Sequence, residues 1–177
     1  GGLWGRFDLL DELRTIQSGG QTVVTSHYDS LQWAKPPARF EGGLGNFSGM
    51  IATGAAIDYL SKQDMDAVHE HEVKLNKIMT NGVKDLNGIE IIGPEDASLR
   101  GGICSLLMHE LPAHDMAILL DEAANVMVRS GQHCVHSWFN SKGHVNGSLR
   151  ASAYMYNTEE EAKLFSDTLE EIVNAFS

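Results

Sequence analysis

The chain has 177 residues, of which 42% are hydrophobic, and this is enough to bury the core of one domain, or of a small domain with part of another. Its 24 acidic and 13 basic residues give a net charge of −11, which argues against nucleic acid or an anionic membrane as the main partner. The negative charge is diffuse, and solubility is its simplest explanation.

No apolar stretch resembles a signal peptide or a membrane span. The two cysteines, Cys104 and Cys134, are too few for a disulfide framework, so we expect a reducing cytoplasm in which a lone thiol stays available. The chain begins GGLW without an initiator methionine. We therefore expect a processed or partial piece of a longer gene product.

Residues 1–46 are expected to be irregular, because breakers interrupt every apolar patch. Gly43 and Gly45 lie in the cluster EGGLGN, where glycines allow the backbone to approach a ligand closely. From spacing alone, a simple connector is the favoured explanation for this cluster. Residues 47–60 then turn helical, and a second helix is predicted over residues 64–83 from its apolar periodicity.

Shorter elements follow, and their order predicts the fold class. Strands are predicted over residues 88–92, 102–108, 125–128 and 148–156, with one helix over 112–124 and a last helix after an N-cap at 157–158. Two helices followed by this β-β-α-β-β-α order describe an α+β unit with an antiparallel or mixed sheet. The first 46 residues do not complete a domain of their own.

The stretch RSGQHCVH places Cys134 between two histidines, in a glycine-containing loop after a predicted strand. A cysteine is a useful nucleophile only as a thiolate, which positive neighbours and imidazoles favour. Cys104 lies in an apolar strand and is expected to be an inert core thiol. Two alternatives stay open for Cys134: a structural thiol, or a zinc site without the usual C-x₂₋₄-C or H-x₃₋₅-H spacing, formed by His133, Cys134, His136 and His144.

Arg150 lies inside an alternating apolar segment, where a buried guanidinium needs an anionic partner. Guanidinium groups bind carboxylates in a bidentate manner, which suits an amino-acid substrate. A structural salt bridge with one of the many acidic residues explains the position equally well.

Three segments together resemble the C-terminal half of a class V aminotransferase-type enzyme of the cysteine desulfurase and selenocysteine lyase family. RFEGGLGNFSGMIATGAAIDYL (39–60) resembles the family's RFE-x-G-x-x-N loop and the helix after it. VRSGQHCVHSWF (128–139) resembles the R-x-G-x-H-C segment, and SLRASAYMYNTEEEAKLF (148–165) resembles the R-A-S-x-x-x-Y-N-T-x-E-E segment. The resemblance covers nearly the whole chain in the right order, and variants such as GGL and HCVHSWFN look most like an archaeal branch.

This resemblance implies a role for each candidate residue in a pyridoxal-phosphate-dependent reaction. Cys134 would take sulfur from the cysteine–pyridoxal adduct and become a persulfide, and His133 matches the histidine before it. Arg150 would bind the substrate α-carboxylate, and Arg129 matches the arginine at the start of the loop. Gly43 falls in the loop that, in family dimers, reaches the cofactor phosphate of the neighbouring subunit.

The resemblance also implies the domain organisation and the partners. Residues 1–50 would be the tail of the large cofactor-binding domain, and residues 51–177 the small C-terminal domain of a fold-type I enzyme. Implied partners are L-cysteine, a second copy of the chain in a homodimer, and a sulfur-acceptor protein of iron–sulfur cluster or related assembly. The sequence departs from the family pattern at Leu44 and Gly45, where threonine and proline are usual, and at Gln132, where histidine is common.

The family's aldimine lysine, its cofactor-stacking histidine and its aspartate near the pyridine nitrogen belong to a larger N-terminal half. The first lysine here, Lys35, lies in no matching motif. We therefore expect the chain alone to be inactive and to need that half, as a longer chain or a separate subunit. Selenocysteine lyase, another eliminating relative, and a non-enzymatic persulfide carrier or regulatory module are the alternatives. The retained Arg150 favours an enzyme, because a bare carrier needs no carboxylate clamp.

Overall fold

The computed structural model describes residues 1–176. They form two compact units, and the boundary between them along the chain lies between Lys62 and Gln63. The first unit consists of loops and short elements followed by one helix, and the second holds a four-stranded sheet and the hydrophobic core. Within residues 1–176, no helix combines the length and the apolar character needed to cross a membrane.

The first unit contains more regular structure than its sequence predicts. Its elements are α1 (Phe7–Glu12), the antiparallel strands β1 (Val23–Ser26) and β2 (Leu31–Trp33), the 3₁₀ turn η1 (Ala38–Phe40), and α2 (Phe47–Leu60). The Arg39 guanidinium folds back onto α1 and donates to the carbonyls of Leu10 (2.8 Å) and Leu13 (3.0 Å). Strands this short leave no periodic signal, so the expectation of an irregular segment over residues 1–46 was wrong.

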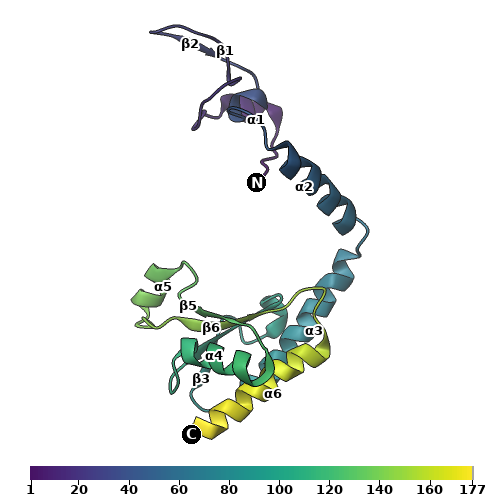
Figure 1. The fold of residues 1–177 in the computed structure, drawn as a ribbon, viewed down its shortest axis with the longest axis vertical. Coiled ribbons are helices and arrows are strands. Elements are labelled where there is room, and N and C mark those ends of the chain that lie inside the picture. Colours follow the sequence, from purple (N-terminus) through teal and green to yellow (C-terminus); the bar gives the residue numbers. More distant parts are fainter. Residues whose placement is uncertain (177) are drawn as a thin grey trace. The chain divides into compact units, whose positions relative to one another are not determined.

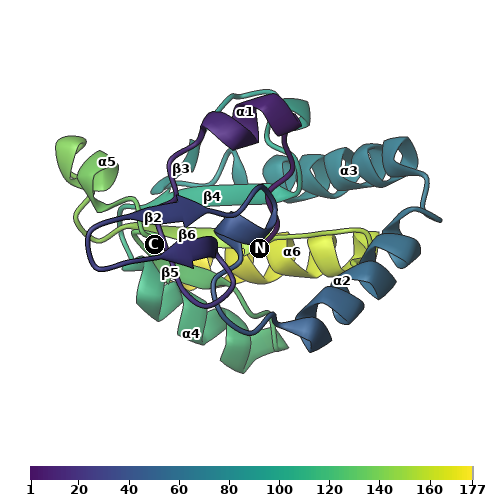
Figure 2. The same cartoon turned by 90° about the horizontal axis from the view of Figure 1, so that it is seen from above.

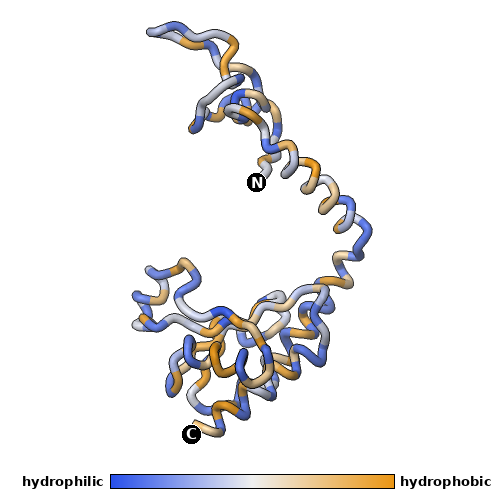
Figure 3. Tube along the Cα trace, in the orientation of Figure 1, coloured by the Kyte–Doolittle hydropathy of each residue, from blue (hydrophilic) through white to orange (hydrophobic). Residues whose placement is uncertain are grey.

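Helix α2 begins where the sequence predicts. Asn46 caps it, because its Oδ1 accepts a hydrogen bond from the Gly49 N–H at 3.0 Å. Apolar residues occur on every side of the helix, and none of its side chains is buried (Figure 3). A helix that is apolar all round is characteristic of a surface that a further segment or chain covers.

The second unit confirms the predicted α+β class. Its elements are α3 (Met65–Val83), β3 (Ile89–Ile92), the 3₁₀ turn η2 (Ala97–Leu99), β4 (Ile103–Met108), α4 (Ala113–Ala124), β5 (Arg129–Gly131), α5 (His136–Ser141), β6 (Ser148–Ser152) and α6 (Glu159–Phe176). The strands lie in the order β3-β4-β6-β5, and every neighbouring pair is antiparallel (Figures 1 and 2). Helices therefore pack on a short antiparallel sheet.

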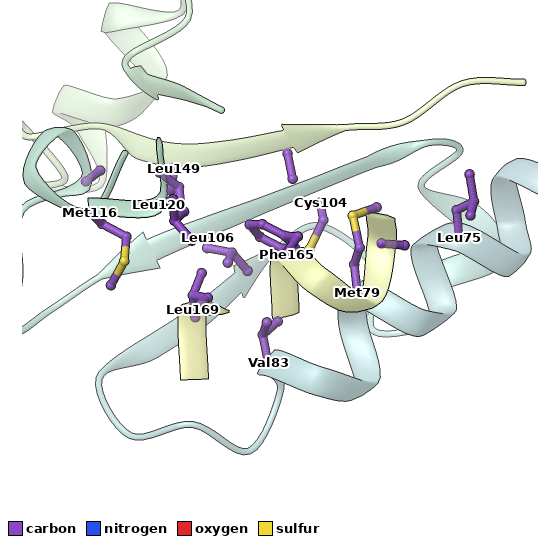
Figure 4. Close-up of a cluster of buried hydrophobic side chains, with 13 residues drawn as sticks. Leu75, Met79, Val83, Cys104, Leu106, Met116, Leu120, Leu149, Phe165 and Leu169 are labelled. Carbon is purple, nitrogen blue, oxygen red and sulfur yellow. The ribbon is translucent and has the colours of Figure 1, made fainter. Parts of the chain in front are cut away.

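The core lies on one face of this sheet. Cys104 and Leu106 from β4 and Leu149 from β6 point to that face, where they meet the apolar sides of α3, α4 and α6 (Figure 4). The helices contribute Leu75, Met79, Val83, Met116, Leu120, Phe165 and Leu169. Since successive side chains of a strand point to opposite faces, Ser148 and Arg150 of β6 point away from the core.

Two strand boundaries and one helix differ from the sequence expectation. The sequence predicts a strand over residues 125–128, whereas β5 occupies Arg129–Gly131, after Asn125 ends α4 in the left-handed conformation (φ 55°). The loop expected after Cys134 contains the short helix α5. The strand expected up to residue 156 ends at Ser152.

The last helix starts as predicted, with a reciprocal cap. Thr158 Oγ1 accepts a hydrogen bond from the Glu161 N–H at 3.2 Å, and Glu161 Oε2 accepts one from the Thr158 N–H at 2.9 Å. Asn157 Oδ1 also accepts from the N–H of Tyr154 at 3.0 Å. The YNT sequence therefore fixes the turn that leads from β6 into α6.

Candidate active site

Cys134 lies in a tight turn directly after β5. The Val135 N–H donates to the Gln132 carbonyl at 2.8 Å, and the two residues between them, His133 and Cys134, have positive φ angles of 48° and 64°. Positive φ at both central positions is typical of a type I′ turn and costs non-glycine residues roughly 1–2 kcal/mol each. The cysteine side chain is exposed. The turn thus holds the thiol in a strained, solvent-facing position.

The His133 imidazole is half-buried next to this cysteine. Its Nε2 lies 3.1 Å from Oγ of the fully buried Ser148, and its ring centroid lies 6.4 Å from that of Phe139. Burial lowers the pKa of His133, the positive charges of Arg150 and Arg129 add to the effect, and an interaction with the Ser148 main chain opposes it. A lowered pKa keeps the imidazole neutral near pH 7, so that it is able to accept a proton.

Arg129 and Arg150 are direct neighbours on the face of the sheet that lies opposite the core. Their Cα atoms are partners in the β5–β6 register. Among residues 1–176, neither guanidinium forms an ion pair, and the buried Nε of Arg150 has no hydrogen-bond partner. Like charges directly opposite each other are destabilising, and an unsatisfied buried donor costs about 1–3 kcal/mol. A carboxylate bound here would relieve both penalties.

Gln132 and Gly147 hold the loop around Cys134 together. Gln132 Nε2 donates to Asn140 Oδ1 at 3.1 Å and to the Val145 carbonyl at 2.9 Å, which ties the turn to the C-terminal end of α5 and to the loop after it. Gly147 has a φ of 74°, and a Cβ there would lie 2.2 Å from the Gly131 carbonyl carbon. Only glycine therefore fits at the point where the chain enters β6.

Cys104 has the opposite environment. It is the second residue of β4 and is fully buried, and burial raises the pKa of its thiol, against a smaller lowering effect of the nearby Arg100. A thiol with a raised pKa and no solvent contact is a poor nucleophile. The prediction that Cys104 is a core thiol is confirmed.

The structure brings four of the five predicted site residues into one region of the second unit: Arg129, His133, Cys134 and Arg150. The fifth, Gly43, lies in the first unit with a φ of 83°, and its N–H donates to the Gly20 carbonyl at 2.8 Å. For the zinc alternative, residues 1–176 contain no group of three or more histidine, cysteine or acidic side chains that could hold a metal ion.

Sequence reasoning missed Ser148, which contacts His133. A signal was present, because Ser148 precedes Arg150 by two residues in an alternating segment, and such residues share one face of a strand. Gln132 was noted only as a departure from the family pattern. Its bracing role depends on contacts with residues 8 and 13 positions further along the chain, which no local pattern predicts.

Comparison with known proteins identifies the class of this fold and site. Residues 1–165 match the family model described as aminotransferase class-V. The chain belongs to this family, which confirms the resemblance drawn from the three sequence segments.

Its relatives are more specific. A probable cysteine desulfurase of Methanothermobacter thermautotrophicus is 36% identical over 177 residues, which cover 97% of this chain and 43% of the relative. A probable cysteine desulfurase of Chlamydia muridarum is 34% identical over 180 residues, which cover 99% of this chain and 43% of the relative. The apo structure of a cysteine desulfurase from Thermococcus onnurineus NA1 matches with a TM-score of 0.86 at 33% identity, covering 96% of this chain and 42% of that one. The chain therefore spans about 43% of the length of these curated relatives.

Proposed function

We propose that this chain is the C-terminal portion of a pyridoxal-phosphate-dependent cysteine desulfurase, in which Cys134 receives sulfur from L-cysteine. The observation that carries the proposal is an exposed cysteine on a strained turn, beside a half-buried histidine whose pKa is lowered by burial, and two adjacent arginines without a carboxylate partner. The complete protein would consist of this chain together with the remaining portion that its relatives possess.

Arg150 and Arg129 would bind the α-carboxylate of the substrate. Arg150 is half-buried and points away from the core, so its guanidinium is able to meet a substrate lying over the sheet. A charge-assisted hydrogen bond contributes about 1.5–3 kcal/mol, and the planar guanidinium also fixes the orientation of the carboxylate. The clamp thus selects an amino acid and aligns its side chain for reaction.

Cys134 would act as the nucleophile. Its thiolate attacks the sulfur of the bound cysteine, so that an S–S bond forms while the bond between that sulfur and the substrate Cβ breaks. The electron pair of the broken bond stays with the carbon fragment, which takes up a proton and leaves as alanine. The exposed turn suits this step, because the sulfur is accessible without any rearrangement of the core.

His133 would take up the proton that Cys134 loses. Its lowered pKa provides the neutral imidazole that a proton acceptor needs near pH 7. Ser148 would hold the ring in place through its contact with Nε2. Arg150 and Arg129 thus have a second effect, since their charges favour the neutral form of this histidine.

The loop at Gly43 fits the cofactor phosphate through its backbone. Pyridoxal phosphate, when bound, supplies the electron sink that makes the substrate Cβ–S bond labile. Gly43 provides the positive φ, but its own N–H is occupied by Gly20; among the residues described, the N–H groups of Leu44 and Gly45 donate to no other backbone group. We assign phosphate binding to these two amides, which replace the hydroxyl that Leu44 lacks.

The lysine that holds the cofactor would come from the rest of the complete protein. Lys35, the first lysine of the chain, pairs with Asp11 at 2.7 Å and lies in none of the segments that resemble the family's motifs. The chain alone would then be inactive, with residues 1–50 belonging to the large domain and residues 51–177 forming the small one. The complete protein would act as a homodimer in the cytoplasm and supply sulfur for iron–sulfur cluster assembly. The exposed apolar side chains of α2 would provide surface for contact with the second subunit or with the rest of the protein.

Substitutions in the complete protein test the proposal. Cys134→Ala should lower alanine formation from cysteine at least about a hundredfold, since it removes the nucleophile. Arg150→Gln should raise KM for cysteine about tenfold to a hundredfold, from the loss of the charged hydrogen bond. Cys104→Ala is the matched control and should leave both values near wild type. A Cys134→Ala enzyme that produces sulfide at the normal rate would refute the assignment, and selenide release from selenocysteine would distinguish a selenocysteine lyase.

A further inference from the structure

Buried polar side chains take the place of an apolar core in the first unit. Within residues 1–62, all of which the structure describes, only Thr22, Pro36 and Arg39 are buried, and the hydrophobic core cluster lies in the second unit. Thr22 keeps 1% of its surface accessible and Arg39 keeps 9%. Their contacts lie inside the unit, so they do not depend on which surfaces the rest of the complete protein covers. A buried polar side chain is informative, because it needs partners that a core residue does not.

Arg39 fixes the chain just before the glycine cluster 41–46. Its Nη2 donates to the carbonyls of Leu10 (2.8 Å) and Leu13 (3.0 Å). It also donates to the carbonyl of Asp11, whose carboxylate Oδ1 lies 3.6 Å from Nη1. These carbonyls end α1, where a helix has no partners of its own for them. The guanidinium therefore ties the chain that enters the cluster to the end of α1.

Stability alone does not explain this guanidinium. Within residues 1–176, the buried Nε of Arg39 and the buried Oδ1 of Asp11 have no hydrogen-bond partner. Unpaired buried polar atoms destabilise a fold, and apolar side chains of similar volume often fill such a space without that penalty. What an arginine adds is direction, because its fixed donors determine where the carbonyls lie.

Thr22 fixes the segment on the other side of the cluster. Its Oγ1 donates to the Gly19 carbonyl at 2.7 Å and accepts from the Gly19 N–H at 3.2 Å, which closes a tight turn. In this turn the Gly20 carbonyl accepts the Gly43 N–H at 2.8 Å. A Cβ on Gly42 would lie 3.2 Å from the Gly19 nitrogen, so the two backbones are in close contact. The Thr22 hydroxyl thus orders the turn on which the cluster rests.

The two amides assigned to the cofactor phosphate lie directly after these contacts. Leu44 and Gly45 follow Gly43, and Asn46 then caps α2, so both ends of the cluster are anchored. Backbone N–H groups bind an anion well when they converge on it. A loop that is ordered beforehand also avoids the entropic cost of ordering on binding. The two buried polar side chains therefore bear on phosphate binding without touching the phosphate.

We propose that Arg39 and Thr22 are positioning residues for the phosphate loop, which we define as residues 41–46. The inference rests on the proposed function, because it concerns how this chain holds the cofactor. Arg39 sets the chain that enters the loop, and Thr22 sets the turn that the loop contacts. With both in place, the Leu44 and Gly45 amides are ordered before the phosphate binds.

A comparison of two cofactor forms isolates the phosphate. The complete protein is freed of cofactor and titrated with pyridoxal 5′-phosphate and with pyridoxal, which lacks the phosphate. The absorbance of the bound cofactor gives each Kd, and the phosphate preference is the Kd of pyridoxal divided by that of pyridoxal phosphate. A residue that only stabilises the fold changes both Kd values together or neither. A residue that positions the phosphate loop changes their ratio.

Arg39→Ala and Thr22→Val should each lower the phosphate preference about tenfold, which is roughly the effect of one more loop residue that must be ordered on binding. The Kd of pyridoxal should stay near the wild-type value. Thr22→Ser keeps the hydroxyl and Arg39→Lys keeps a charged donor, so both should recover part of the preference. Thr25→Val and Arg6→Ala are the matched controls, since both side chains are exposed and contact neither the loop nor its turn. They should leave both Kd values unchanged.

Hydrogen exchange in the cofactor-free protein tests the loop itself. The Gly43 N–H, which is bonded to the Gly20 carbonyl, should exchange about tenfold faster in Arg39→Ala and in Thr22→Val, because the bond opens more often. The amides of β4 should keep their protection, since they lie in the second unit. If Arg39→Ala does not fold, Thr22→Val decides alone, because it keeps the shape of the side chain.

An unchanged phosphate preference in either variant would overturn the role of that residue, and so would an equal weakening of both Kd values. A wild-type protein that binds pyridoxal and its phosphate equally well would overturn the inference as a whole. Failure of the proposed function is a different result, namely no binding of either form or no sulfur on Cys134. The two failures are therefore distinguishable.

Discussion

The regions around Cys104 and Cys134 place the same side chain in opposite environments within one small unit. Cys104 lies at the centre of the sheet, on the face covered by three helices, and is fully buried. Cys134 lies three residues beyond the end of the short strand β5, where a turn with two positive φ angles exposes it. In this unit the core lies on one face of the sheet, and the candidate site residues lie at the end of β5 and on the opposite face.

This contrast shows how the fold separates stability from chemistry. The core-facing residues of β6, Leu149 and Ala151, alternate with Ser148 and Arg150, which belong to the candidate site. A single strand therefore anchors both regions, and its register fixes the site residues relative to one another. Alkylation rates, unfolding free energies and the pKa of His133 test whether the two faces of the sheet are independent. The largest effect is expected for alkylation and the smallest for the pKa.

Alkylation should separate the two cysteines most strongly. We expect iodoacetamide to modify Cys134 at least roughly a thousandfold faster than Cys104, because a core strand must open before its thiol reacts, at about 5 kcal/mol or more. The rates are measured by mass spectrometry of the two peptides under native conditions. Comparable rates in the folded protein, with equal rates in denaturant as the control, would show that the second unit has no tight core.

Leu106→Ala should lower the free energy of unfolding by about 2–5 kcal/mol, because it leaves a cavity between the sheet and its helices. Ile103→Ala is the matched control on the same strand. Ile103 is 46% exposed, so we expect a loss below about 1 kcal/mol. Urea denaturation measures both values. Equal losses would contradict the assignment of the core to one face of the sheet.

The variants Gly147→Ala and Gly143→Ala separate the cost of a steric clash from the cost of a positive φ angle. Both glycines have positive φ, 74° and 77°, so both alanines carry the left-handed penalty of roughly 1–2 kcal/mol. Only the Gly147 Cβ would collide with Gly131, which lies at the end of β5. We expect Gly147→Ala to be the more destabilising and to alter the alkylation rate of Cys134. Identical stabilities of the two variants would mean that Gly147 has no special part in shaping the loop.

The pH dependence of His133 should give the smallest effect. Its pKa, measured by NMR, should lie below the ordinary value of about 6.5, and Arg150→Gln should raise it by removing a positive charge. Because the unfolded chain then binds the proton first, stability should fall as the pH drops through about 6.5 and level off below the folded-state pKa. A His133 pKa above the ordinary value would contradict the described environment.

The sequence predicts the second unit well, because long periodic segments and capping residues determine it. Helix α3 and the α6 start lie where the apolar pattern and the cap residues place them. Helix α5 was missed, since its six residues include no apolar repeat and follow a turn whose geometry depends on positive φ at His133 and Cys134. Beta pairing in the first unit was missed for a similar reason, because three- and four-residue strands carry no period.

The candidate site shows the same division. Cys134, Arg150 and Arg129 were found from residue chemistry and from family resemblance, whereas Ser148 emerged only when the strand register placed it beside His133. Long-range contacts of this kind are properties of the folded chain. Residue type therefore predicts which groups are candidates for the reaction, and tertiary packing decides what holds them.

The most direct test is to find where the sulfur goes. The complete protein is incubated with L-cysteine, its thiols are trapped with an alkylating reagent without reduction, and the peptides that contain Cys134 and Cys104 are weighed. We predict the added mass of one sulfur atom on the Cys134 peptide and none on the Cys104 peptide. Alanine formation with no sulfur on Cys134, or with sulfur on another cysteine, would contradict the assignment of Cys134 as the persulfide-forming nucleophile.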